Sequence, residues 1–187
     1  WHTLGVDLIG RLSEEKQVMA QFTQAIFQSA SSWPVIGDYD VVVCGAGPGG
    51  SGAAVAAARL GARTLVVEKQ GAPGGVATFG NCPHLMGLGD GARQISGGVA
   101  DELVRRLDRL GQARFRQPPP GASDALIGDL PLLGSVIASI HGLQLAALQL
   151  LREAGVERLF YATLLGAVVQ DKRISAIAVD RLEGPGL

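Results

Sequence analysis

The amino-acid sequence predicts an α/β fold in which a parallel sheet is flanked by helices and joined to a β-hairpin. The first observation is a short apolar, β-branched run at 40–44, which is typical of a parallel strand buried on both faces. The second is a glycine-rich turn at 45–50 that opens a helix of small residues. The third is another apolar run at 64–67, which ends in Glu68. Together these observations predict a β-α-β unit.

Length and charge limit the classes of protein to which the chain can belong. Its 187 residues suffice for one domain with an appendage, and 16 Lys and Arg residues balance 17 Asp and Glu residues. A net charge of -1 without a basic block argues against binding to nucleic acid or to an anionic membrane surface. No apolar run reaches the roughly 18 residues of a membrane span. Two cysteines, Cys44 and Cys82, cannot form a disulfide framework or a zinc site on their own, so we expect a reducing, cytoplasmic compartment.

Residues 1–37 are predicted to form an N-terminal helical extension, and residues 38–187 the main domain. The extension's helix is expected to begin at Ser13, whose hydroxyl can cap free N–H groups, and apolar residues then recur at three- and four-residue steps. Its polar face carries one lysine, Lys16, and lacks the basic residues of a membrane-lying helix. We therefore expect it to pack against a domain or a partner, and to end before Pro34, which has no N–H to donate.

The glycines of the turn have the spacing Gly-x-Gly-x-x-Gly, and each has a physical role. Gly45 permits a tight turn, Gly47 lets the backbone approach a pyrophosphate, and Gly50 lets the helix lie close to the sheet. The free N–H groups and positive dipole at the helix start favour a phosphate there. Glu68, at the tip of the second strand, could accept hydrogen bonds from both ribose hydroxyls of an adenine nucleotide, and its charge argues against a 2'-phosphate. A glycine-rich turn without a ligand is the alternative.

At this point the sequence resembles a known family. Residues 41–69 look like the start of FAD-dependent oxidoreductases that have the glutathione-reductase type of FAD domain. Gly74-Gly75-Val-Ala-Thr78 is similar to the Gly-Gly-x-x-Thr element that follows the second strand in one branch. Residues 97–107 resemble its next helix, and 153–179 the following helix, strand and hairpin. The resemblance covers about 39–181 and implies a Rossmann-like FAD-binding domain, incomplete within this chain.

The resemblance implies FAD as the cofactor and assigns its contacts. The glycine turn would carry the pyrophosphate and Glu68 the adenosine ribose, with Lys69 beside the adenine. The element at 74–78 would approach the flavin end of the pyrophosphate, and Leu165 would meet the adenine with main-chain atoms. No metal site is expected. The expected cofactor-binding residues are Gly45, Ala46, Gly47, Pro48, Gly49, Gly50, Glu68, Lys69, Gly74, Gly75, Thr78 and Leu165.

The glycine-rich segment at 71–98 lacks a helical period and is expected to be a loop, either ordered around a ligand or flexible in solution. Within it lie the reactive side chains of Cys82 and His84. His84 could be a general base or a covalent attachment point for the flavin, and Cys82 could be a nucleophile. The alternative is an ordinary loop histidine and a small buried thiol. Cys44, which ends a predicted buried strand, is expected to pack in the core.

The rest of the chain alternates between helical and extended patterns. Residues 99–110 form an apolar stripe whose opposite face is expected to be solvated, and 141–152 form a second amphipathic helix that Ser139 can cap. A strand at 159–161 precedes a hairpin that turns at Asp171-Lys172. The solvated face of the first of these helices would carry Asp101, Glu102, Arg105, Arg106, Asp108 and Arg109. Residues 126–140 have no clean period and support no structural prediction.

The resemblance implies a flavoenzyme that oxidises a small organic substrate by hydride transfer to FAD. It extends only to the family's N-terminal portion, because a later strand with Ala-Thr-Gly and a substrate domain have no counterpart here. A sheet without that strand would expose an apolar edge, so we expect a hetero-oligomer in which a second polypeptide carries the remaining half, without which this chain is inactive. Two other functions are compatible with the residues: a non-catalytic nucleotide-binding scaffold, and an NAD-binding fragment of a dehydrogenase.

Overall fold

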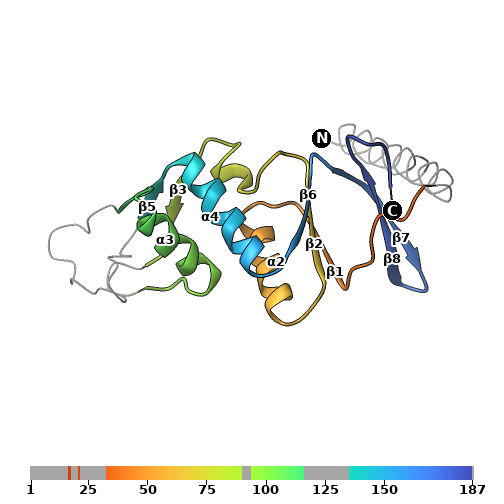
Figure 1. Cartoon of the computed structure of the whole chain (residues 1–187), viewed down its shortest axis with the longest axis horizontal. Coiled ribbons are helices and arrows are strands. Elements are labelled where there is room, and N and C mark those ends of the chain that lie inside the picture. Colours follow the sequence, from red (N-terminus) through yellow and green to blue (C-terminus); the bar gives the residue numbers. More distant parts are fainter. Residues whose placement is uncertain (1–16, 18–20, 22–32, 90–93, 116–134, 187) are drawn as a thin grey trace, which may run out of the picture. The chain divides into compact units, whose positions relative to one another are not determined.

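The computed structural model divides the chain into two compact units, one of residues 39–161 and one of residues 1–38 with 162–187. The boundary predicted between residues 37 and 38 stays a prediction. Most of the predicted N-terminal helix lies outside the described residues, although Gln17 and Gln21 are described as helical and exposed. The structure describes residues 17, 21, 33–89, 94–115 and 135–186 (Figure 1).

The larger unit contains a parallel sheet of three strands in the order β1-β2-β6. These are β1 (Val41–Cys44), β2 (Thr64–Glu68) and β6 (Glu157–Phe160), and the register pairs Val42 with Leu65 and Val66 with Arg158. All five residues of β2 are buried, because this strand has neighbours on both sides. Burial on both faces, which the sequence predicted for the first strand, is therefore found in the central strand β2.

The predictions for the first strand itself were wrong. In β1, Val41, Val42 and Val43 are half-buried and Cys44 is exposed, whereas the sequence predicted a strand buried on both faces and a thiol packed in the core. The physical reason is position, since among the described strands β1 lies at the edge of the sheet and pairs only with β2. Partial desolvation nevertheless raises the pKa of the Cys44 thiol, which favours its protonated form.

Three helices accompany the sheet, as the sequence predicted: α2 (Pro48–Arg59), α3 (Val99–Arg109) and α4 (Ile140–Glu153). Ser139 caps α4, because its side-chain oxygen accepts a hydrogen bond from the Gly142 N–H. The small residues of α2 let it lie close to the sheet. The core between helices and sheet contains Ala46, Ala54, Val55, Val66, Leu150, Leu151 and Val156.

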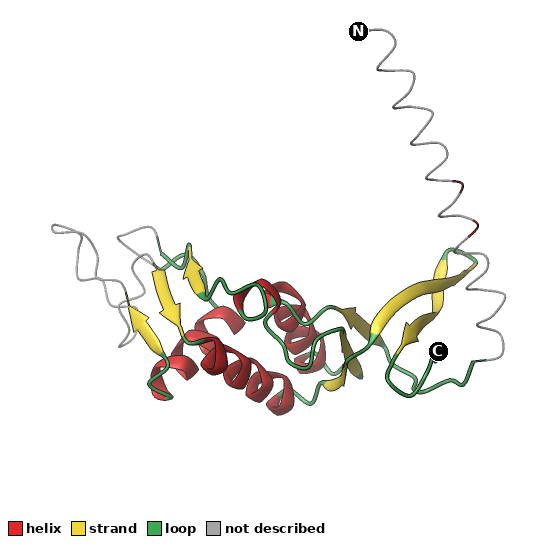
Figure 2. Ribbon diagram, turned by 90° about the horizontal axis from the view of Figure 1, so that it is seen from above, coloured by secondary structure: helices red, strands yellow, loops and turns green. Residues whose placement is uncertain are grey.

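A second, antiparallel sheet lies in the same unit, beside α3 (Figures 1 and 2). Its order is β3-β5-β4, formed by β3 (His84–Met86), β5 (Ser135–Ala138) and β4 (Ala113–Phe115). Together with the short 3-10 helix η1 (Gly75–Ala77), β3 gives structure to a segment that was predicted to be a loop. No described helix is long and apolar enough to cross a membrane.

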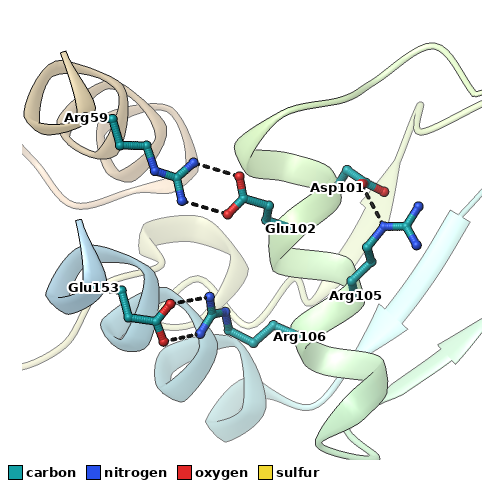
Figure 3. A network of polar contacts seen from close by, with 6 residues as sticks. All are labelled: Arg59, Asp101, Glu102, Arg105, Arg106 and Glu153. Carbon is teal, nitrogen blue, oxygen red and sulfur yellow. Dashed lines mark hydrogen bonds and ion pairs between the residues drawn. The ribbon is translucent and has the colours of Figure 1, made fainter.

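The charged face of α3 is not simply solvated, because Glu102 and Arg106 pair with residues of other helices and Asp101 pairs with Arg105, which corrects the prediction for these four residues (Figure 3). The guanidinium of Arg59, at the end of α2, donates to both carboxylate oxygens of Glu102 at 2.6 and 2.7 Å. Arg106 donates to both oxygens of Glu153, in α4, at the same two distances. Each bidentate pair joins α3 to a neighbouring helix. The Arg106 side chain is only 14% exposed.

The smaller unit contains the predicted hairpin, β7 (Thr163–Gln170) and β8 (Arg173–Asp180). Asp171 and Lys172 form its turn with φ of 49° and 63°, so both lie in the left-handed region, as a tight hairpin turn requires. The register shifts twice along the hairpin, between Leu164 and Gly166 and again between Val168 and Val169. The predicted hairpin and its turn are confirmed.

Candidate functional site

The first glycine turn, residues 45–50, begins where β1 ends. Gly45 has a φ of +101°, and its N–H donates to the carbonyl oxygen of Val67 at 2.7 Å. A methyl group on Gly50 would lie 1.9 Å from the carbonyl oxygen of Gly45. Only glycine fits at this position, because the obstacle is backbone and cannot swing aside. The turn and the first turn of α2 are therefore in direct contact.

The start of α2 offers free backbone donors beside open space. Gly47 precedes the helix with φ of -64° and ψ of 178°, and no side chain caps it. Pro48 occupies the first helical turn, where its missing N–H costs nothing. A methyl group on Gly47 or Gly49 would meet nothing within 4 Å, so the space beside these backbone atoms is clear. Uncapped N–H groups at a positive helix end fit a phosphate group.

Glu68 is buried, with 6% of its surface exposed, and it joins the turn to the end of β2. One carboxylate oxygen accepts a hydrogen bond from the Ala46 N–H at 2.7 Å, and the other accepts from the Gln70 N–H at 2.8 Å. Each carboxylate oxygen can accept a second bond, so capacity for two ribose hydroxyls remains. The neighbouring Lys69 is exposed. The bridging role of Glu68 within the protein was not predicted from the sequence.

The second glycine element, residues 74–78, lies directly on the first turn. The Gly74 N–H donates to the carbonyl oxygen of Ala46 at 2.8 Å, and a methyl group on Gly75 would lie 3.0 Å from the Cα of Gly47. Both glycines have positive φ, at +119° and +50°. The structure thus brings together the two glycine segments that the sequence assigned to one ligand.

Two hydroxyl groups hold these turns in shape. Thr78 is 3% exposed, and its hydroxyl donates to the carbonyl oxygen of Pro73 at 3.2 Å, so it braces the second glycine element. Ser51 donates to the carbonyl oxygen of Ala46 at 3.0 Å and braces the first. Ser51 was not among the residues predicted for the site, although a hydroxyl directly after the last glycine of the motif is a visible signal.

Tyr161 lies at the same edge of the parallel sheet and was also missed. The register pairs Glu68 with Phe160, so Tyr161 follows β6 beside the end of β2. Its φ is +54°, its N–H donates to the carbonyl oxygen of Gln70 at 3.2 Å, and its side chain is 58% exposed. A methyl group on Gly71 would lie 2.2 Å from the Tyr161 hydroxyl oxygen, so the ring lies against Gly71. No sequence pattern signals a positive φ at tyrosine.

The predicted reactive side chains lie at the second sheet. Cys82 is exposed and free just before β3, and its N–H donates to the carbonyl oxygen of Val76 at 3.1 Å. His84 is half-buried in β3, and its Nε2 is buried without a hydrogen-bond partner. Leu165 lies in β7 of the smaller unit, and its contact with adenine stays a prediction. Within the described ranges, no three His, Cys, Asp or Glu side chains are arranged to hold a metal ion.

Comparison with known proteins places this geometry in a family. Residues 40–186 match the family described as FAD dependent oxidoreductase. The chain belongs to this family. The predicted resemblance is confirmed, and so is FAD as the cofactor of this chain. The uncapped helix start, the open space at Gly47 and Gly49 and the spare acceptor capacity of Glu68 all fit the pyrophosphate and ribose of that group.

Curated relatives match parts of the chain. A dihydrolipoyl dehydrogenase of Trypanosoma brucei brucei is 52% identical over 50 residues, which are 27% of this chain and 10% of that protein. A tRNA uridine 5-carboxymethylaminomethyl modification enzyme MnmG of Desulfitobacterium hafniense is 39% identical over 75 residues, or 40% of this chain and 10% of that protein. The matched part of the chain thus spans about a tenth of the length of each of these relatives.

A solved structure confirms the predicted fold class. A geranylgeranyl bacteriochlorophyll reductase-like protein from Thermoplasma acidophilum superposes with a TM-score of 0.52 at 22% identity, over 79% of this chain and 36% of that one. At that identity the likeness shows the fold alone. It is the α/β, Rossmann-like arrangement in which a parallel sheet is flanked by helices.

Proposed function

We propose that this chain forms the FAD-binding part of an oxidoreductase that oxidises a small organic substrate by hydride transfer to FAD. The observation that carries the proposal is the junction of the two glycine segments, where the Gly74 N–H meets the Ala46 carbonyl and Glu68 accepts the Ala46 N–H. The junction lies at the start of α2, which no side chain caps. Gly47 and Gly49 leave space for a ligand there. When bound, FAD supplies the hydride acceptor, and the protein supplies binding and orientation.

Each cofactor-binding residue has a separate part in this proposal. The N–H groups at the start of α2 donate to the pyrophosphate, and Gly47 and Gly49 leave room for its oxygens. Glu68 accepts hydrogen bonds from the ribose hydroxyls with its remaining lone pairs, while its present bonds fix the carboxylate in place. Lys69 and Leu165 would face the adenine.

His84 and Cys82 are proposed as the reactive side chains. A buried nitrogen without a partner is costly unless something else satisfies it, which supports a role for the His84 Nε2 in accepting a proton or in attachment of the flavin. Cys82 is exposed and free, which supports a thiol accessible to substrate or flavin.

We also propose that a second polypeptide completes the enzyme in the cytoplasm. The exposed edge of β1 supports this partner, because parallel strands are normally covered on both sides and an open edge invites pairing. Both cysteines of the chain are free, which supports a reducing compartment.

The test is a visible absorption spectrum and a mass spectrum of the natively purified protein, before and after denaturation. Flavin absorbance together with a second polypeptide supports the proposal, and pigment that stays on the chain after denaturation identifies covalent attachment. A colourless protein that takes up no added FAD would overturn the proposal in favour of a scaffold. Release of nicotinamide nucleotide without flavin would instead favour an NAD-binding fragment.

A further inference from the structure

The sheet β3-β5-β4 covers the helices with one face only. Leu85, Val136 and Ala138 belong to core clusters that include residues of α3 and α4, so their side chains point toward the helices. Because side chains alternate along a strand, the residues between them point to the other face. Two residues of this other face are exposed, since Ile137 is 48% exposed between two buried neighbours and Met86 is 69% exposed, whereas Ser135 on the same face is buried.

The register places three residues of this outer face in one row. His84 in β3 lies opposite Ile137 in β5, and Arg114 in β4 lies opposite the same Ile137. Directly opposed residues of antiparallel strands share a face, so an imidazole, an isoleucine and a guanidinium follow one another across the sheet. Strands are spaced about 4.8 Å apart, so the two ends of the row are about 10 Å apart at their Cα atoms.

The chemistry of this face is unusual for the outer side of a sheet. Such a face normally carries polar residues, whereas this one exposes Met86 and Ile137, which lie diagonally across the two paired strands β3 and β5. Arg114 is exposed and has no hydrogen bond or ion pair within the part of the chain that the structure describes. The three strands contain no Asp or Glu, so no carboxylate of theirs neutralises that guanidinium. His84 adds a buried Nε2 without a partner.

We propose that this face binds the substrate of the oxidoreductase, and that the substrate is a small apolar carboxylic acid. The Arg114 guanidinium donates two hydrogen bonds to the carboxylate, a pairing to which its planar fork is suited. Ile137 and Met86 contact the apolar body, and His84 faces its far end. A molecule about as long as one aromatic ring fits between His84 and Arg114, the two ends of the row. This inference rests on the proposed function, since it names the substrate class of the same enzyme.

The test uses the purified full chain with its native cofactor content and benzoate as the probe, with neutral benzamide as the comparison. Isothermal titration should show that benzoate binds at least about tenfold more tightly than benzamide, because a charge-assisted pair contributes more than a neutral hydrogen bond. Arg114→Gln should remove that preference. The control Arg152→Gln, which removes an exposed arginine of α4, should leave it unchanged. Ile137→Ser should weaken the binding of both probes.

Equal affinity for the two probes, no binding of either, or an Arg114→Gln variant with unchanged preference would overturn the inference. The melting temperature of each variant shows whether it is folded. The flavin absorbance of the same samples separates the two proposals: bound flavin without benzoate binding rejects this inference alone, whereas absence of flavin rejects the proposed function. Benzoate binding that depends on Arg114 in flavin-containing protein supports the inference, whereas the same binding without flavin would show a carboxylate site and overturn its assignment as the substrate site of an oxidoreductase.

Discussion

Glu68 stabilises the fold at the place where we propose that it also binds the ribose. Its carboxylate accepts hydrogen bonds from the N–H groups of Ala46, in the first glycine turn, and Gln70, just after β2. The sequence predicted the ribose contact from the position of Glu68 at a strand end. The two backbone bonds could not be predicted, because they depend on the course of the chain after the turn rather than on residue type.

Replacement of Glu68 by glutamine should therefore lower both stability and FAD affinity. The amide nitrogen of glutamine must face one of the two N–H groups that the carboxylate now accepts, which leaves a buried donor unpaired. We expect a loss of about 1–3 kcal/mol in the free energy of unfolding, measured by urea denaturation, together with weaker FAD binding. Glu183→Gln, at an exposed glutamate of the smaller unit, is the matched control. Unchanged stability in Glu68→Gln would show that these bonds contribute nothing.

At the scale of elements, the helices were predictable and their mutual contacts were not. Periodicity located α3 and α4, and Ser139 marked the start of α4 correctly. The partners of Glu102 and Arg106 lie on other helices, so the pattern within α3 could not show that these side chains form pairs rather than a solvated face. The strands β3 and β5 were missed because the residues they pair are far apart in the sequence.

The two bidentate pairs predict how stability depends on pH. Hydrogen bonds from Arg59 and Arg106 are the main cause that lowers the pKa of Glu102 and of Glu153. A carboxyl group with a lowered pKa in the folded state adds stability above its unfolded pKa of about 4.3, and this stability is lost as the pH falls through the folded value. The effect is modest, because both carboxylates remain accessible to solvent, with Glu102 38% and Glu153 57% exposed.

Urea denaturation across a pH series checks this expectation. The free energy of unfolding of the wild type should fall more steeply below a pH of about 4.3 than that of the double variant Glu102→Gln/Glu153→Gln. Asp108→Asn changes an exposed carboxylate on the same helix and should keep the wild-type slope. Identical slopes in the wild type and the double variant would show that the pairs do not contribute to stability.

For the molecule as a whole, the sequence motif correctly predicted the family and its cofactor, FAD, whereas the surfaces of the fold became visible only in the structure. The β-α-β unit was predictable because strand, glycine turn and helix are contiguous. The burial of β1 was not predictable, because it depends on which strands lie beside β1 in the sheet. The wrong prediction of a fully buried strand also led to the wrong prediction that Cys44 is packed in the core. The exposed face with Arg114 and Ile137 was equally hidden, since its row is assembled from three separate strands.

We propose that the first glycine turn holds the pyrophosphate of FAD, and equilibrium titration of the full chain with FAD is the direct test of this role. The wild type is compared with Gly47→Ala and Gly52→Ala, two positions where a methyl group meets no protein atom within 4 Å. Both variants should fold, and only Gly47→Ala should lose affinity, by about tenfold or more, because its methyl group occupies the space proposed for the phosphate oxygens. Equal FAD affinity of Gly47→Ala and the wild type would contradict the account.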